Sequence, residues 1–229
     1  GIPIVNAINN GLNANNISKF MGIFNGTSNF ILSKMTHEQT TFKDALEEAQ
    51  RLGFAEADPT DDVEGVDAAR KVVITSYLSF NQVIKLNDVK SVGISDITLA
   101  DINAASALNY KIKSIGKGTY ENGYVNASVE PTLIHKNHQL AAVENEYNAI
   151  YVIGDAVGDT MFYGKGAGSL ATGSAVVSDL LNVALFFESN LHTLPPHFEL
   201  KTEETKEMMD GAEPVVIQEK SNYYIVISN

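Results

Sequence analysis

The stretch of the chain best suited to chemistry runs from Gly53 to Leu78 and reads GFAEADPTDDVEGVDAARKVVITSYL. Its first half concentrates carboxylates, and only two cations follow: Glu56, Asp58, Asp61, Asp62, Glu64 and Asp67, then Arg70 and Lys71. Carboxylates this close repel one another unless a cation lies among them. The imbalance predicts a binding place for a ligand that carries an ammonium group.

The second half of this stretch predicts a helix from about Val66. Asp58 precedes a proline and is therefore biased toward an extended conformation, so the helix begins only after the turn that ends at Gly65. Apolar residues then recur at helical spacing, which places Asp67 and Lys71 one turn apart on one face. From chemistry alone two interpretations carry equal weight: an ordinary surface ion pair, or a functional lysine kept charged by the surrounding acids.

Three separated motifs together resemble one family. They are FNGTSNFIL from Phe24 to Leu32, EADPTDDVEGVDAARK from Glu56 to Lys71, and YGKGAGSLATGSAVVSDL from Tyr163 to Leu180. In this order they resemble homoserine dehydrogenase of the bacterial monofunctional kind, and the likeness covers almost the whole chain. It implies an NAD- or NADP-dependent cytoplasmic oxidoreductase. Such an enzyme interconverts L-homoserine and L-aspartate 4-semialdehyde in threonine, methionine and isoleucine biosynthesis.

The resemblance assigns roles to the acidic stretch. Lys71 matches the proposed proton donor and acceptor of the family, and Asp67 would orient Lys71 or a water. Glu56 matches the acid that binds homoserine, and Asp62 lines the same pocket, so these two would hold the ammonium group of the substrate.

A polar turn precedes the first predicted helix. Asn25, Gly26 and Thr27 would leave backbone N–H groups free to take an anion such as a substrate carboxylate. The plainer interpretation is an N-cap by Ser28. The resemblance favours the first, because its matching Gly-Thr pair contacts substrate or nicotinamide, with Asn25 on the cofactor side.

The third motif carries a glycine-rich loop. Gly166 and Gly168 open a predicted helix, but GKGAG is not GxGxxG and no strand with a ribose-binding acid follows. The pattern alone therefore predicts no complete dinucleotide site. The resemblance implies that this loop closes the cleft beside the nicotinamide, and that the backbone at Gly1 and Ile2 belongs to a loop that holds a monovalent cation such as sodium.

The hydrophobic periodicity predicts an α+β fold, a mixed β-sheet covered by helices. Alternation around Glu121, Asn122 and Gly123 predicts a hairpin with one covered face and one wetter face. Strands are expected at 19–25, 110–117, 124–129 and 148–153. Helices are expected at 41–52, 66–80 and 99–108, with a short one that follows the turn 25–28 and runs through 35, and one that the glycine-rich stretch opens and that runs through 187. The β-prone run 222–228 is expected to find no strand to pair with.

The domain boundaries follow from composition and from the resemblance. Residues 1–194 are predicted to form the substrate-binding, catalytic and dimerisation domain, with 164–187 returning to a nucleotide-binding domain. A charged linker is expected at 195–220, and a regulatory domain of the ACT type starts at 221–229. The resemblance also implies a dinucleotide-binding domain before Gly1, without which the chain is expected not to catalyse hydride transfer.

The overall composition excludes several classes. With 16 basic and 28 acidic residues the net charge is −12, and the scattered basic residues make nucleic acid an unsuitable partner. The sequence contains no run of eighteen apolar residues, so it predicts no membrane span. The chain has no cysteine, which rules out a thioester-forming aldehyde dehydrogenase. The histidines show no metal-site spacing, and His135 with His138 is expected to form a solvated turn.

Two functions from different classes remain open on the sequence. The first is the oxidoreductase domain described above, with homoserine as substrate and a homodimer formed through the sheet. The alternative is a non-catalytic dimerisation or amino-acid-sensing module that keeps the acidic pocket. An enzyme domain needs a dinucleotide-binding partner domain, whereas a sensor binds an amino acid alone.

Overall fold

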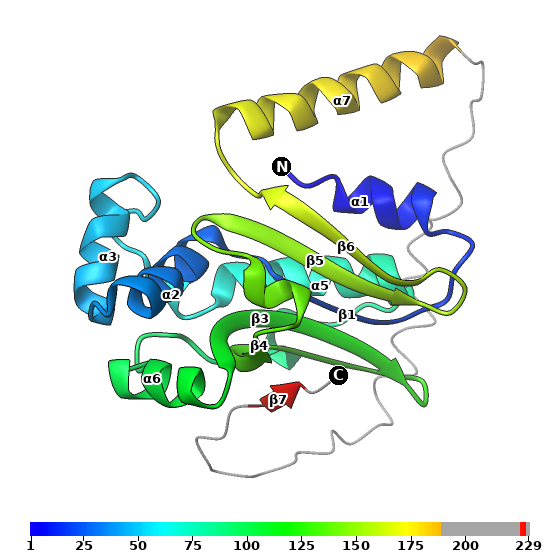
Figure 1. Cartoon of the computed structure of the whole chain (residues 1–229). Coiled ribbons are helices and arrows are strands. Elements are labelled where there is room, and N and C mark those ends of the chain that lie inside the picture. Colours follow the sequence, from blue (N-terminus) through cyan, green and yellow to red (C-terminus); the bar gives the residue numbers. More distant parts are fainter. Residues whose placement is uncertain (189–224, 228–229) are drawn as a thin grey trace. The chain divides into compact units, whose positions relative to one another are not determined.

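The computed structural model describes residues 1–188 and 225–227 (Figure 1). The chain divides into two units, which are treated separately. The first comprises Gly1–Thr172 with Tyr224–Asn229 and contains the sheet and every candidate site residue. The second comprises Gly173–Tyr223, and its described part belongs to the C-terminal helix.

A mixed sheet forms the centre of the first unit. The strand order is β2-β4-β3-β1-β5-β6, with β7 also paired to β4. Neighbours are antiparallel except for β2 and β7, which run parallel to β4. The strands are β1 (Ile17–Ile23), β2 (Lys90–Ser91), β3 (Tyr110–Glu121), β4 (Tyr124–His135), β5 (Tyr147–Gly154), β6 (Gly158–Lys165) and β7 (Ile225–Ile227). The predicted α+β class with a mixed sheet is confirmed.

The helices fall close to the predicted segments. The fifth, α5, has the predicted start and end, and positive φ angles at Gly65 (79°) and Asn81 (53°) bound it. The helical elements are α1 (Ile4–Asn6), η1 (Ala7–Gly11), α2 (Gly26–Glu38), α3 (Phe42–Arg51), α4 (Thr60–Val63), α5 (Val66–Phe80), η2 (Leu86–Asp88), α6 (Leu99–Ala107), η3 (Gln139–Ala142) and α7 (Ser169–Glu188). No helix in the described residues combines the length and apolar character needed to cross a bilayer.

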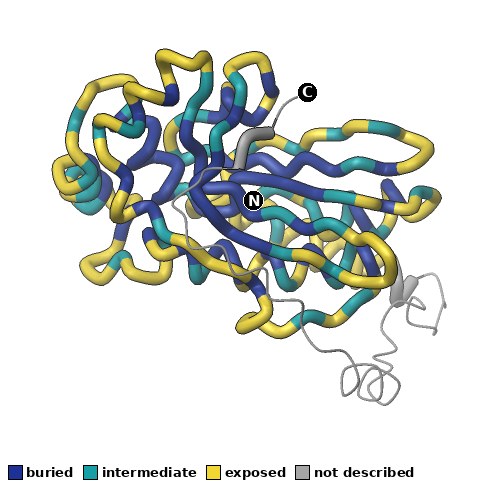
Figure 2. Tube along the Cα trace, turned by 90° about the horizontal axis from the view of Figure 1, so that it is seen from below, coloured by how far each residue is buried: buried dark blue, intermediate teal, exposed yellow. Residues whose placement is uncertain are grey.

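Helix α5 packs on one face of the sheet through Val72, and glycines on β3 make room for it. A Cβ on Gly116 would lie 2.6 Å from the Val72 side chain and 2.7 Å from the Phe24 ring. The glycine therefore lets the helix approach the strand. Figure 2 shows that buried residues follow the central strands and that exposed residues lie at the loops.

Two further apolar clusters complete the first unit. Helices α2, α3 and α6 share one around Phe30, Leu32 and Ala45. The other lies on the sheet face opposite α5, where Leu140 of η3 packs against residues of β1, β3 and β5. Helix α2 thus begins soon after β1 ends and packs on α3 and α6.

The hairpin between β3 and β4 turns where the sequence predicts. Asn122 and Gly123 have φ angles of 54° and 87°, the left-handed pair that a two-residue hairpin turn requires. Both strands are longer than predicted, because β3 continues past Lys117 to Glu121 and β4 continues past Val129 to His135. Alternation defines the centre of a strand better than its ends.

Two sequence expectations are wrong. The run 222–228 was expected to lack a partner, but Ile225–Ile227 pairs in parallel with β4. His138 was expected in a solvated turn, but it is buried and its Nδ1 accepts the Leu140 N–H. The predicted linker at 195–220 lies outside the described residues.

Candidate active site

The site is built around the turn that joins β1 to α2. Asn25 caps the helix, and its Oδ1 accepts the Ser28 N–H at 2.8 Å. Ser28 is therefore the donor in the cap rather than the capping residue, which corrects the plainer sequence interpretation. The Asn25 Nδ2 donates to Asp62 Oδ1 at 2.6 Å and to Asp67 Oδ2 at 2.9 Å. One amide thus bridges two carboxylates of the acidic stretch.

Lys71 lies at the centre of this network. Its Nζ donates to Asp67 Oδ2 at 2.6 Å, one helical turn away as predicted, and to the Phe24 carbonyl oxygen at 3.1 Å. The Lys71 side chain is 48% exposed and that of Asp67 is 29% exposed. An ammonium group has three donors, and the described residues offer Nζ no third acceptor. Lys71 is therefore oriented from two sides and keeps one donor for a ligand.

Other carboxylates of the stretch have partners of their own. Asp58 accepts the N–H and hydroxyl of Thr60, and Asp61 pairs with Arg70 at 2.5 Å. Glu64 accepts the Ser95 hydroxyl. The carboxylates of the stretch that these local partners do not engage are Glu56, Asp62 and Asp67.

Glu56 is not brought into contact with Lys71. Its side chain is exposed and, within the described residues, its carboxylate forms no hydrogen bond or ion pair. The loop that carries it is nevertheless tied to the start of α2, because the Thr27 hydroxyl donates to the Phe54 carbonyl oxygen at 2.6 Å. Gln50 Nε2 also donates to the Glu56 carbonyl oxygen at 3.0 Å. The backbone is fixed and the carboxylate is free.

The predicted glycines lie around the same end of the sheet. A Cβ on Gly26 would lie 2.7 Å from the Glu146 carbonyl oxygen. Gly166, just after β6, packs against the side-chain amide of Asn148, which in turn donates to the Ile23 carbonyl oxygen at 3.0 Å. These close approaches require glycine. They also bring the glycine-rich loop beside the turn that holds Lys71.

The remaining predicted positions follow the same loop. Gly1 lies against the backbone carbonyl groups of Lys165 and Gly166, and Ile2 follows it. Gly168 has a φ of 108°, a conformation that favours glycine. The described residues contain no cluster of three or more His, Cys, Asp or Glu side chains that could hold a metal ion.

Two features of the site were not predicted. The Phe24 carbonyl holds Lys71, and the Asn25 amide bridges two aspartates. The first leaves no mark in the sequence, because any residue type supplies a carbonyl. The Asn25 cap could have been predicted, because asparagine is a common capping residue at a helix start. The two aspartates that its amide bridges are distant in sequence and are brought together only by the fold.

Taken together, this geometry defines an α+β domain with a lysine and carboxylate pair suited to proton transfer on a polar substrate. The sequence profile described as homoserine dehydrogenase matches residues 3–181, and the chain belongs to that family.

Known relatives and solved structures agree with this assignment. The homoserine dehydrogenase of Bacillus subtilis is 53% identical over 183 residues, which is 80% of this chain and 42% of that protein. A crystal structure of S. aureus homoserine dehydrogenase is 86% identical with a TM-score of 0.74, covering 85% of this chain and 48% of that one. A more distant structure, of a hyperthermophilic archaeal homoserine dehydrogenase mutant in complex with NADPH, is 29% identical with a TM-score of 0.67. The match covers 80% of this chain and 52% of that one. The chain spans less than half the length of the curated relatives it matches.

Proposed function

We propose that this chain supplies the substrate-binding and catalytic part of a homoserine dehydrogenase. The reaction interconverts L-homoserine and L-aspartate 4-semialdehyde, with NAD or NADP taking or returning the hydride. The observation that carries the proposal is the state of Lys71: Asp67 and the Phe24 carbonyl orient it, and one donor stays available. That is the arrangement that general acid-base catalysis at a hydroxyl requires.

The chemistry balances with Lys71 as the proton carrier. In the oxidative direction, neutral Lys71 takes the proton of the substrate hydroxyl while the C–H bond of the same carbon breaks and releases a hydride. In the reductive direction, the Lys71 ammonium donates its free proton to the carbonyl oxygen as the hydride arrives. A cation beside that oxygen also stabilises the negative charge that develops there.

The acids divide between orientation and binding. Asp67 orients Lys71 directly. Asp62 is held by the Asn25 amide, and Glu56 carries a free carboxylate on the neighbouring loop, so these two are suited to bind the ammonium group of homoserine. Charge-assisted hydrogen bonds of this kind are stronger than neutral ones.

The cofactor side of the proposed site is formed by Asn25, Gly26, Thr27, Gly166 and Gly168. The support for Gly26 and Gly166 is steric, because both pack close to the Asn148 side chain, where a Cβ would be crowded. NADPH is the cofactor named for the archaeal relative. The bound nicotinamide would supply the hydride acceptor, and the residues named here would position its ring beside the substrate.

We extend the proposal to a monovalent cation at the backbone of Gly1 and Ile2. Carbonyl oxygens are the usual ligands of such ions, and those of Lys165 and Gly166 lie against Gly1. A dependence of activity on sodium, with choline as the control cation, tests this point.

A homodimer and a cytoplasmic location complete the proposal. The sheet face opposite α5 carries exposed Met161 and Tyr163 on the edge strand β6. Covering such a face with a second copy is common in homo-oligomers. Light scattering tests the mass: a dimer supports the proposal, and a monomer contradicts it.

The decisive experiment is a chimera in which this chain replaces the matching half of the S. aureus enzyme. We expect homoserine-dependent reduction of NAD(P) by the chimera, and none by this chain alone. A folded chimera without turnover would contradict the proposal. Tight homoserine binding by this chain alone, without turnover in the chimera, would instead support the sensing module.

A further inference from the structure

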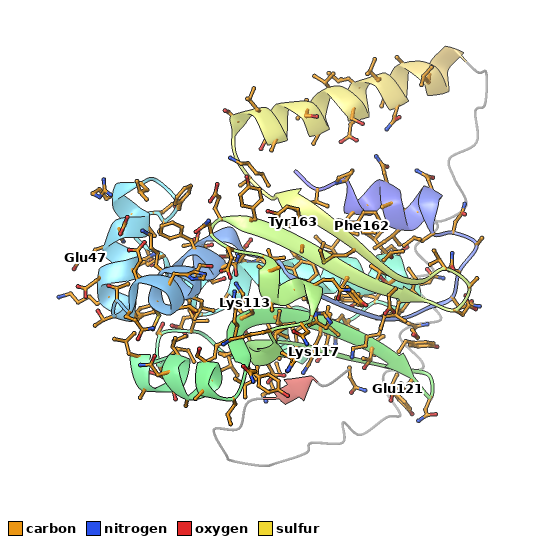
Figure 3. The ribbon with its side chains drawn as sticks, in the orientation of Figure 1. Glu47, Lys113, Lys117, Glu121, Phe162 and Tyr163 are labelled. Carbon is orange, nitrogen blue, oxygen red and sulfur yellow. The ribbon has the colours of Figure 1, made fainter. Side chains whose placement is uncertain are left out.

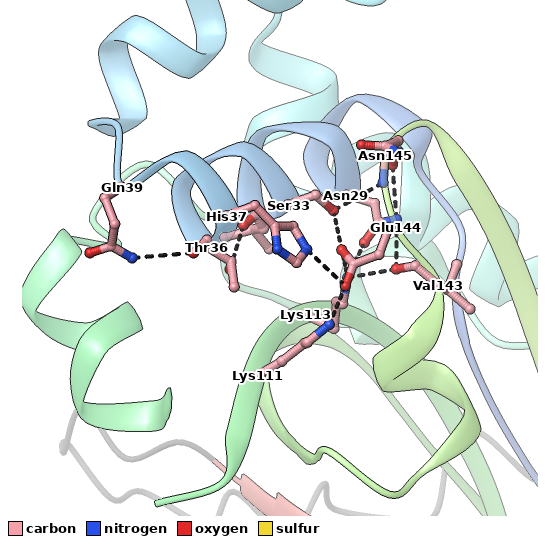
Figure 4. Close-up of polar contacts among 11 residues, drawn as sticks. Asn29, Ser33, Thr36, His37, Gln39, Lys111, Lys113, Val143, Glu144 and Asn145 are labelled. Atoms are coloured by element: carbon pink, nitrogen blue, oxygen red, sulfur yellow. Dashed lines mark hydrogen bonds and ion pairs between the residues drawn. The ribbon is translucent and has the colours of Figure 1, made fainter. Parts of the chain in front are cut away.

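A buried polar cluster lies on the side of α2 that faces away from its apolar contacts. Asn29 and Ser33, one turn apart, both contact the segment 143–147 that leads into β5 (Figure 4). The two N–H groups of the Asn29 Nδ2 are shared among three carbonyl oxygens, those of Val143, Asn145 and Tyr147, at 3.2, 2.9 and 3.1 Å. Ser33 Oγ accepts the Asn145 N–H at 3.0 Å.

Lys113 of β3 forms hydrogen bonds with this cluster. Its three donors are all used: Asn29 Oδ1 at 3.1 Å, the Val143 carbonyl oxygen at 2.6 Å and Glu144 Oε2 at 3.1 Å. Figure 3 labels Lys113 and Lys117, which both lie on β3. Burial lowers the pKa of Lys113 to about 8, against the opposing effect of Glu144. The lysine is thus held as a charged, fully hydrogen-bonded core group near neutral pH.

Glu144 is the counter-charge. Burial alone would raise its pKa, but Lys113, Lys111 and the Ser33 hydroxyl outweigh burial and lower the pKa to about 2. Ser33 Oγ donates to it at 2.7 Å, and His37 Nε2 lies 3.3 Å from its Oε1. The segment 143–147 is therefore anchored by charge as well as by hydrogen bonds.

The same segment supports the turn that holds Lys71. Gly26 packs against the Glu146 carbonyl oxygen, where a Cβ would lie at 2.7 Å. Two residues on, the Asn148 Nδ2 donates to the Ile23 carbonyl oxygen at 3.0 Å, directly before Phe24. The turn from Phe24 to Gly26 is thus held on both flanks by residues 146–148.

We propose that Asn29 is a positioning residue for the reaction, because its contacts fix α2 on the segment 143–147 and thereby fix the Phe24 carbonyl and the Asn25 amide that orient Lys71. This inference rests on the proposed function. Asparagine suits the position because its amide both donates to the converging carbonyl groups and accepts from Lys113. A residue with only one of these capacities would leave buried polar groups without partners.

The test uses the chimera with Asn29→Ala and, as a milder change, Ser33→Ala. The matched control is Phe80→Leu, which loosens the core at the far end of α5, where Phe80 stacks on Phe20. We expect Asn29→Ala to lower kcat by ~10-fold, within the loss that small misplacement of a catalytic group causes, while KM for homoserine changes little. Ser33→Ala follows in the same direction. Phe80→Leu lowers the melting temperature but leaves kcat unchanged.

Hydrogen exchange of the Ser28 amide gives a readout without catalysis, since that N–H is bonded to Asn25. We expect Asn29→Ala and Ser33→Ala to speed the exchange of this amide more than Phe80→Leu does, when the variants are compared at the same free energy of unfolding. Equal effects of the three variants on kcat and on this amide would overturn the positioning role. Normal turnover of Lys71→Ala would instead overturn the proposed function, so the two failures are distinguishable.

Discussion

Two lysines of this chain, each paired with a carboxylate, differ in how their donors are used. Lys71 Nζ has two acceptors and a side chain that is 48% exposed. Lys113 Nζ has three acceptors and a side chain that is 2% exposed. Lys71 therefore has a donor for a substrate, whereas Lys113 cannot give up a proton without disturbing its neighbours.

The difference separates catalytic from structural use of the same residue type. A buried, fully bonded ion pair stabilises one arrangement of the chain, and removing one partner leaves the other charge uncompensated. An oriented lysine with a free donor can move a proton to or from a ligand. The number of unused donors, rather than the presence of a paired acid, distinguishes the two sites.

The largest expected effect is on stability at the buried cluster. Glu144→Leu leaves Lys113 without its counter-charge, and breaking a buried pair in this way costs about 3–5 kcal/mol of unfolding free energy. Urea denaturation followed by circular dichroism measures the loss. The matched control is Glu47→Ala, which removes an exposed pair with Lys43 at 3.9 Å and should cost less than about 1 kcal/mol. Equal costs would remove the distinction between the two kinds of pair.

The second expected effect is on turnover at the exposed lysine. Lys71→Ala in the chimera should lower kcat by about 100-fold or more, the scale of losing general acid-base catalysis, with an unchanged melting temperature. Lys43→Ala, another exposed lysine on a helix, should leave kcat unaltered. Near-normal turnover of a folded Lys71→Ala variant would take this lysine out of the mechanism.

A smaller effect is expected at the binding acids. Glu56→Gln should raise KM for homoserine by about tenfold and lower kcat less, because a bond to a spectator ammonium group stabilises ground state and transition state alike. Asp62→Asn should act in the same direction. Steady-state kinetics separate the two parameters, and a pure kcat effect with constant KM would assign Glu56 to the chemistry instead.

The smallest effect is a pH dependence of stability. Lys113, Lys111 and Ser33 outweigh burial and lower the pKa of Glu144 to about 2 from an ordinary 4.5, so the unfolded chain binds more protons between these values. The stability from Glu144 is thus present above about pH 4.5 and is lost as the pH falls toward 2. Lys111, Lys113 and His37 face this carboxylate. Between pH 5 and pH 3 the melting temperature should fall less for Glu144→Gln than for the unaltered chain. Equal falls for the two proteins would contradict the assignment.

The fold was largely predictable because its local signals are strong. Helical spacing defines α5, the threonine cap at Thr41 starts α3, and the Asn-Gly pair sets the β3 to β4 turn. The pairing of β7 with β4 was not predictable, since strand partners far apart in sequence leave no local pattern.

The candidate site was likewise predictable only in part. The i,i+4 pair of Asp67 and Lys71 was readable because helical geometry alone brings the two side chains together. The bridge from Asn25 to Asp62 and Asp67 was not readable, because it joins elements that meet only in the folded chain. Glu56 remains a prediction, since its carboxylate makes no contact within the described residues that would place it in the network.

Chemical rescue tests most directly whether Lys71 is the proton carrier and Lys113 a structural group. Turnover of the Lys71→Ala and Lys113→Ala chimeras is measured against increasing ethylamine, which can enter an exposed site but not a filled core. We expect turnover of Lys71→Ala to rise in proportion to the amine concentration, and that of Lys113→Ala not to respond. Rescue of Lys113→Ala with no response from Lys71→Ala would contradict this account.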